Sequence, residues 1–211
     1  MNPLFNTLLF SPLFLLTLNI RDPTEACSCM PAHPQEQICN SNIVILANIQ
    51  SKTVVEDSYS LKIIKYEVKQ IKMFKGFEKV KDVQYVFTPL TEASCGVKLK
   101  VRKKKKNQYL LSGKMGNDGR IFISLCGFIK PWNKLTVAQK TNLHKNYEMG
   151  CDCKIIGCPV EPCPITISSV CLWTDWLKEQ TFYGHQAKNC ACFKDSDGAC
   201  SWHHDPSISE P

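Results

Sequence analysis

The sequence predicts a mainly β fold with helices, in which a small closed barrel or a sandwich is followed by a small disulfide-rich domain. Short apolar or alternating segments separated by turn residues recur over about a hundred residues, which is typical of small β folds. One later segment has helical spacing instead. Residues 151–211 hold eight of the 13 cysteines and little periodicity, so disulfides are expected to replace a large core there.

The first part of the chain contains six candidate strands. Residues 43–49 are β-branched and apolar, and residues 61–71 contain an alternating stretch with Ile64, Tyr66 and Val68 on one side. The polar residues 51–60 between them are expected to form a hairpin tip. Further strands are predicted over residues 83–88, 95–101, 109–112 and 121–125. Before the first strand, Pro34 suits the first position of a short helical turn towards Cys39.

Residues 134–150 change to a helical pattern. Thr136 and Gln139 form a capping box, and Leu143 and Tyr147 lie four residues apart on one helix face. Gly150 is expected to stop the helix in the left-handed conformation. We expect this helix to pack on the β domain.

The last part of the chain is rich in aromatic residues as well as cysteines. Packing of the aromatic rings is expected to supply the core of the small domain. The tail from His203 is expected to fray. The aromatic cluster comprises Trp173, Trp176, Phe182 and Tyr183.

An apolar leader precedes the first cysteine. Residues 4–20 are an apolar run followed by a polar stretch, with small residues Thr24 and Ala26 before Cys27, which is the layout of a signal peptide. A membrane anchor is the alternative, but the run is at the lower limit for spanning and contains Pro12. We therefore predict that residues 1–26 are removed and that the protein is secreted to the extracellular space or matrix, with no membrane span.

The cysteines predict a disulfide framework, because many cysteines behind a signal peptide meet an oxidising compartment. Their number is odd, so at least one thiol is left over. Two pairs have Cys-x-Cys spacing, Cys27 with Cys29 and Cys151 with Cys153. Zinc binding is the competing use, but zinc-ligand pairs usually stand further apart. Residues i and i+2 of an extended segment project side by side, so each is expected to have its own distant partner.

Several other features have a plain structural interpretation. His33 could bind metal, but we expect a structural hydrogen-bonding residue. The basic run 102–106 is most simply a solvated loop, although with a net charge of +7 it could bind sulfated glycosaminoglycan or acidic matrix. Nucleic-acid binding is disfavoured by secretion. The sequence contains no Ser-His-Asp set, HExxH metal motif or phosphate loop, so we expect no enzyme activity.

A series of short motifs runs through the chain after residue 26. It begins with CSCMPAHPQ at residues 27–35 and Cys39. It continues with YEVKQIKMFKG at 66–76, CGV at 95–97, CGFIKPW at 126–132, MGCDC at 149–153, CLWTDW at 171–176 and GHQAK at 184–188. In these motifs the chain resembles the tissue inhibitors of metalloproteinases, and within that family the second paralogue, over the whole chain after residue 26.

This resemblance implies a netrin-like OB-fold, a five-stranded barrel, over residues 27–150 and a disulfide-rich domain over residues 151–211. It also implies a specific disulfide pairing that leaves Cys190 unpaired. The implied pairs are Cys27–Cys95, Cys29–Cys126, Cys39–Cys151, Cys153–Cys200, Cys158–Cys163 and Cys171–Cys192.

The resemblance further implies that the protein inhibits zinc matrix metalloproteinases. A catalytic zinc has one open position, and the α-amine and carbonyl oxygen of a mature N-terminal Cys27 can chelate it. Ser28 would enter the primed-side specificity pocket of the protease. The resemblance implies no cofactor of the protein's own, because the only metal involved is the zinc of its target. We expect the protein to be a monomer. The residues predicted to bind the protease are Cys27, Ser28, Cys29, Met30, Pro31, Asn40, Tyr59, Lys62, Glu92, Ala93 and Ser94. A netrin-like module that binds matrix or a receptor without inhibiting a protease is the alternative.

Overall fold

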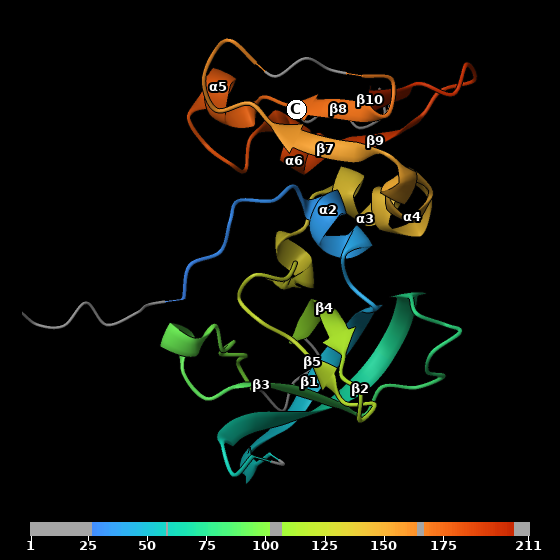
Figure 1. The fold of residues 1–211 in the computed structure, drawn as a ribbon. Coiled ribbons are helices and arrows are strands. Elements are labelled where there is room, and N and C mark those ends of the chain that lie inside the picture. Colours follow the sequence, from blue (N-terminus) through green and yellow to red (C-terminus); the bar gives the residue numbers. More distant parts are fainter. Residues whose placement is uncertain (1–26, 58, 102–106, 164–166, 205–211) are drawn as a thin grey trace, which may run out of the picture.

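The computed structural model describes residues 27–57, 59–101, 107–163 and 167–204 (Figure 1). The predicted signal peptide, the basic run 102–106 and the end of the tail lie outside these residues, so what was predicted for them stays a prediction. The larger sheet comprises β1 (Ile43–Glu56), β2 (Lys62–Lys75), β3 (Tyr85–Pro89), β4 (Gln108–Met115), β5 (Ile121–Phe122) and β6 (Lys130–Pro131).

Five strands of this sheet form a ring of pairings. The order is β1-β2-β3-β5-β4, and β4 pairs again with β1. All pairs are antiparallel except β3 with β5. Alternate side chains of the strands point into the ring, where the fully buried Tyr66, Ile45 and Leu111 belong to one core cluster. The structure is therefore mainly β, as the sequence predicts.

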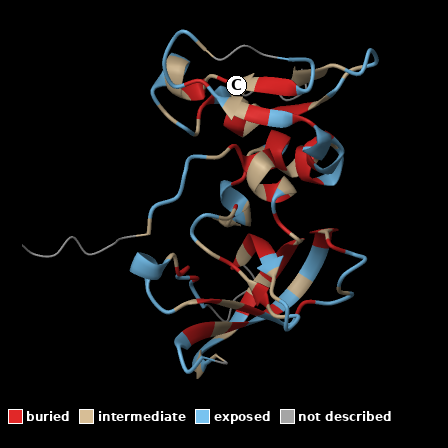
Figure 2. Cartoon of the chain, viewed as in Figure 1, coloured by how far each residue is buried: buried red, intermediate tan, exposed pale blue. Residues whose placement is uncertain are grey.

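A layer of helices packs on the outer side of this sheet, between it and the C-terminal strands (Figure 1). It comprises α2 (Pro34–Cys39), η3 (Trp132–Lys134), α3 (Val137–His144), α4 (Asn146–Met149) and η4 (Gly150–Asp152), of which η3 and η4 are 3-10 helices. Val44 and Leu46 of β1, Leu143 and Tyr147 of the helices and Ala191 share a second buried cluster. The helical layer thus contacts both the larger sheet and the C-terminal strands, and the red interior in Figure 2 runs through it.

The C-terminal part contains two small sheets. They are the parallel pair β7 (Lys154–Gly157) and β8 (Val170–Trp173) and the antiparallel pair β9 (Cys190–Lys194) and β10 (Cys200–His204), with helices α5 (Asp175–Glu179) and α6 (His185–Asn189). The aromatic cluster packs as a core only in part. The ring centroid of Phe182 lies 4.5 Å from that of Trp176 and 5.8 Å from that of Trp173, but of these three rings only Trp173 is buried.

Five local predictions were wrong. Residues 51–56 continue β1 instead of forming a hairpin tip, and residues 95–101 form no strand. Helix 134–150 is divided at Lys145, and Gly150 has a φ of −84°, outside the left-handed region. His203 and His204 belong to β10 and are not frayed.

Candidate functional site

The first described residues form an exposed segment that two disulfides fix to the loops that carry Cys95 and Cys126. Cys27 is bonded to Cys95 and Cys29 to Cys126, with Cα–Cα distances of 4.9 and 5.3 Å. Residues 27–33 have no regular secondary structure, and the side chain of Met30 is 89% exposed. A segment whose residues 28–31 are exposed is thereby held in one place (Figure 2).

The sulfur atoms of the two disulfides form one cluster. All four lie within 4.8 Å of one another, and the Sγ of Cys27 is 3.9 Å from that of Cys29 and 4.0 Å from that of Cys126. This spacing would also suit a tetrahedral metal site, but a metal needs thiolates and these sulfurs are bonded in pairs. The cluster therefore acts as an anchor of the N-terminal segment.

A short exposed ridge lies beside this anchor, at the 3-10 helix η2 (Glu92–Ser94). Thr91 caps the helix, since its side-chain oxygen accepts a hydrogen bond from the backbone N–H of Ser94 at 3.3 Å. Cys95 follows in the left-handed conformation with a φ of 65°. The next residue must be glycine, because a Cβ at Gly96 would collide with the carbonyl oxygen of Pro89.

The Cys27–Cys95 disulfide joins the N-terminal segment to this ridge. Ser28, Met30 and Pro31 are exposed, as are Glu92 and the other two residues of η2. Figure 1 shows both segments emerging on the same side of the molecule. Two stretches that are 68 residues apart in the sequence are therefore combined into one exposed surface.

His33 fixes the other end of the N-terminal segment. Its Nδ1 accepts a hydrogen bond from the backbone N–H of Gln35 at 3.2 Å, and its Nε2 donates to the carbonyl oxygen of Gln186 at 3.1 Å. The ring is fully buried beside Trp173 and Trp202, and burial lowers its pKa to about 4. His33 is thus the structural hydrogen-bonding residue that the sequence predicts.

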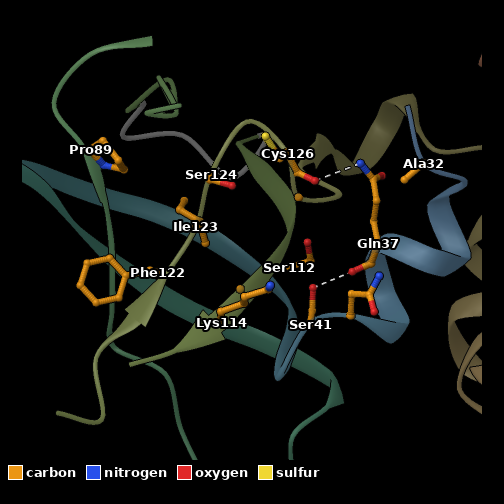
Figure 3. A pocket seen from close by; sticks show the side chains of 13 residues that line it. Ala32, Gln37, Ser41, Pro89, Ser112, Lys114, Phe122, Ile123, Ser124 and Cys126 are labelled. Atoms are coloured by element: carbon orange, nitrogen blue, oxygen red, sulfur yellow. Dashed lines mark hydrogen bonds between the residues drawn. The ribbon is translucent and has the colours of Figure 1, made fainter. Parts of the chain in front are cut away.

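A cavity of about 460 Å³ is lined by Cys126 together with Gln37 and Ser41 (Figure 3). Gln37 of α2 crosses one wall of it, donating from Nε2 to the carbonyl oxygen of Cys126 at 3.2 Å, while Ser41 donates to the carbonyl oxygen of Gln37 at 2.7 Å. These bonds support the loop that carries Cys126. Sequence reasoning missed this cavity, because its lining comes from α2, β4 and the loop after β5, which have no common pattern.

Three residues predicted to bind the protease lie away from the ridge. Asn40 caps the C-terminus of α2 and lines the same cavity as Cys126. Tyr59 and Lys62 lie at the end of the β1–β2 hairpin, where Tyr59 is 82% exposed and its backbone N–H donates to the carboxylate of Asp57 at 2.9 Å. The structure thus combines Cys27–Pro31 with Glu92–Ser94 but leaves the hairpin residues as a separate exposed group.

The structure contains six disulfides, and their pairing coincides with the pairing that the family resemblance implies. The four remaining pairs after those of Cys27 and Cys29 are Cys39–Cys151, Cys153–Cys200, Cys158–Cys163 and Cys171–Cys192. Cys190 is free and buried, with its Sγ 3.8 Å from Nδ1 of His185. Burial raises the pKa of this thiol to about 11, so it is an unreactive core residue.

An exposed segment whose conformation is fixed by disulfides loses little conformational freedom on binding, so it is suited to bind a partner protein. The family profile for "Tissue inhibitor of metalloproteinase" matches residues 25–202. The chain belongs to this family and is a metalloproteinase inhibitor.

Individual relatives agree with this assignment. The chain is 50% identical over 183 residues to metalloproteinase inhibitor 4 of Rattus norvegicus, covering 85% of this chain and 81% of the relative. It is 47% identical over 194 residues to metalloproteinase inhibitor 2 of Homo sapiens, covering 90% and 86%. Metalloproteinase inhibitor 3 of Scyliorhinus torazame is 42% identical over 191 residues, covering 90% and 87%. No helix in the described part of the chain is long and apolar enough to cross a membrane.

Proposed function

We propose that this protein is a secreted inhibitor of zinc matrix metalloproteinases that binds the catalytic zinc of its target through the α-amine and the carbonyl oxygen of Cys27. The observation that carries this proposal is the double disulfide anchor, which holds Cys27 in an exposed position beside the ridge Glu92–Ser94. Residues 1–26 must first be removed, since an amide nitrogen at Cys27 could not act as a ligand.

The chemistry requires no side chain of the inhibitor. A catalytic zinc keeps one position open for the water that attacks the substrate. A neutral amine and a carbonyl oxygen from one residue would chelate the zinc of the target and displace the water, with the zinc becoming five-coordinate, so hydrolysis would lose its nucleophile. The thiol of Cys27 is not a ligand, because it is bonded to Cys95.

Preorganisation supplies much of the expected affinity. A free chain end loses conformational freedom when it binds, whereas this segment has already lost that freedom through its two disulfides and the hydrogen bonds of His33. Ser28 is a small polar residue suited to a specificity pocket of many proteases. Met30 and Pro31 would continue along the cleft, with Glu92–Ser94 beside them.

The remaining predicted contacts extend the interface. Cys29 would contribute through its backbone beside the ridge. Asn40, at the end of α2, and Tyr59 and Lys62, at the exposed end of the β1–β2 hairpin, would reach the protease outside the ridge. The ring of five strand pairings supports a netrin-like OB-fold as the scaffold. In this proposal the only metal involved is the zinc of the target protease, and the inhibitor acts as a monomer.

The proposal is tested with two refolded forms of the protein, one that begins at Cys27 and one that retains Ala26. Each is titrated against an active matrix metalloproteinase. Only the form beginning at Cys27 is expected to inhibit, because only it has an α-amine next to the chelating carbonyl. The matched control is Lys52→Ala in the form beginning at Cys27, a change on the exposed part of β1 that should leave inhibition unaltered.

Equal inhibition by both forms would contradict zinc chelation by the amine. Inhibition by neither form, with both correctly folded, would favour the alternative of a module that binds matrix or a receptor. Folding of the two forms is compared by near-UV circular dichroism and by the absence of more than one free thiol, the number that the structure leaves at Cys190.

A further inference from the structure

Lys130 has an unusual environment for a lysine of this protein. It begins β6, which pairs with Leu110 of β4, and its side chain is half-buried. Its Nζ lies 3.1 Å from the centroid of the Tyr183 ring and 5.6 Å from that of Phe128. The Tyr183 ring is itself fixed, since its hydroxyl donates to Oε1 of Gln139 at 2.9 Å. The amine is therefore held against an aromatic surface instead of moving freely in water.

No acidic group compensates the charge of this amine. None of the four ion pairs among the described residues includes Lys130. The charged group that faces it is a second cation, Lys188 of α6, whose Nζ lies 5.9 Å from the same Tyr183 ring. Burial, and to a lesser extent the charge of Lys188, lowers the pKa of Lys130 to about 8. The contact with the Tyr183 ring favours the ammonium form, but with this pKa a larger fraction of Lys130 than of an exposed lysine is a neutral amine at physiological pH.

The amine is also accessible to small molecules. Lys130 lines an open cavity of about 320 Å³ whose wall also includes Met30, Pro31 and Phe182. A buried lysine without such an opening would not meet a reagent, and an exposed lysine would stay fully protonated. The side chain of Lys130 is partly shielded from water, and a small molecule can still reach its amine.

Lys75 shows why burial alone is insufficient. Burial lowers its pKa too, but its Nζ donates to the carbonyl oxygens of Ile38 and Cys39 at 3.1 and 2.7 Å. Those bonds engage the protons of the ammonium group, and the amine has little freedom to attack another molecule. Lys75 is therefore an internal control for Lys130.

We propose that Lys130 is a covalent modification site that reacts selectively with small aldehydes. The ammonium group first releases a proton to solvent, and the lone pair of the neutral nitrogen then attacks the carbonyl carbon. The resulting carbinolamine loses one water molecule and becomes an imine, so the reaction needs no oxidant or reductant. The bound aldehyde occupies the cavity that Met30 and Pro31 also line.

The modification has a consequence for inhibition, and this consequence rests on the proposed function. An adduct on Lys130 would fill space next to Met30 and Pro31, which are proposed to lie along the protease cleft. We therefore expect the modified protein to inhibit a metalloproteinase more weakly than the unmodified protein.

The test is labelling of the mature protein with acetaldehyde at pH 7.4, with cyanoborohydride to reduce the imine to a stable ethylamine. Peptide mass mapping follows the rate at each lysine. Lys130 is expected to react on the order of tenfold faster than Lys188, Lys140 and Lys75, because a larger fraction of it is neutral. Its lower basicity makes it a weaker nucleophile, which offsets part of this gain. Lys188→Gln should slow labelling of Lys130, since the neighbouring cation no longer favours the neutral amine.

Equal labelling rates at Lys130 and Lys188 would overturn the proposal. The α-amine of Cys27 also reacts with aldehydes, so the inhibition readout uses Lys130→Arg as the matched control. Treatment should reduce inhibition more in the unaltered protein than in Lys130→Arg, and the difference measures the effect of Lys130. The labelling rate does not depend on inhibition, so a failure of the proposed protease mechanism would leave this part of the test intact.

Discussion

At the scale of single residues, His33 makes the stability of the protein depend on pH. Burial lowers its pKa to about 4, whereas an unfolded histidine titrates near 6.5. Between these values the unfolded chain binds the proton more tightly, so protonation favours unfolding. The contribution to stability is complete above about pH 6.5 and is lost as pH falls to about 4, with a full size of about 3 kcal/mol.

This prediction is tested by denaturant unfolding at several pH values between 7.5 and 4. His33→Asn is the matched variant, because asparagine can still cap α2 but does not titrate in this range. The difference in unfolding free energy between the two proteins is expected to shrink as pH falls, since other titrating groups are common to both. A difference that stays constant with pH would show that the pKa of His33 is the same in the folded and the unfolded chain, which would contradict the prediction.

Gly150 shows what a residue pattern can and cannot reveal. Its position after a helical segment predicted a left-handed C-terminal residue, which is the usual reason for glycine there. In the structure the reason is close packing, since a Cβ would collide with the carbonyl oxygen of Cys192 and Nε2 of Gln35. Both partners are distant in sequence, and no local pattern indicates them.

At the scale of elements, the capping box of α3 was predictable because it is entirely local. Thr136 accepts a hydrogen bond from the backbone N–H of Gln139 at 3.0 Å, and Oε1 of Gln139 accepts from the backbone N–H of Thr136 at 3.2 Å. The hydroxyl of Thr136 also donates to the carbonyl oxygen of Lys188 at 2.6 Å, a contact with α6 that the sequence does not indicate.

We expect Thr136→Ala to lower the unfolding free energy by about 1–2 kcal/mol, because it removes the cap of α3 and its bond to α6. Thr136→Ser retains the hydroxyl and should stay within about half a kcal/mol of the original protein. Chemical denaturation with intact disulfides measures both. Equal losses in the two variants would mean that the methyl group of Thr136, and not its hydroxyl, stabilises the helix.

The strands show where periodicity fails as a guide. Residues 51–56 are polar and were predicted to be a turn, yet they pair with residues 62–67 in an exposed hairpin stabilised by backbone hydrogen bonds. Conversely, residues 95–101 contain buried Val97 and Leu99 but form no ladder. Side-chain hydroxyls replace a neighbouring strand there, since Val97 N–H donates to Thr88 Oγ1 and Leu99 N–H donates to the hydroxyl of Tyr66.

At the scale of the whole molecule, the sequence predicts the β class and the N-terminal anchor, because cysteine spacing and strand patterns are local and specific. Which surfaces pack together depends on contacts between distant residues. The helical layer shares a buried cluster with Ala191 of β9, and Gln139 donates from Nε2 to the carbonyl oxygen of Ala187 at 2.9 Å. The predicted division of the chain at residue 150 therefore separates segments that share a core.

Gln35 is the clearest link between the two parts. It is fully buried, and its Nε2 donates to the carbonyl oxygens of Gly150 at 3.1 Å and Cys192 at 2.6 Å, while its Oε1 accepts from the backbone N–H of Cys192 at 2.8 Å. Gln35→Leu keeps a similar volume but removes all three bonds. Each buried group left without a partner costs about 1–3 kcal/mol, so we expect a loss of about 2–5 kcal/mol.

Gln37 is a matched control on the same helix, because it makes a single exposed side-chain bond, to the carbonyl oxygen of Cys126. Thermal unfolding is followed by tryptophan fluorescence, and three of the four tryptophans lie after residue 150. Gln35→Leu should shift this transition to much lower temperature than Gln37→Leu does. Equal shifts would mean that the Cys39–Cys151 disulfide and the apolar cluster alone hold the C-terminal part against α2, and that the buried amide of Gln35 adds nothing to their coupling.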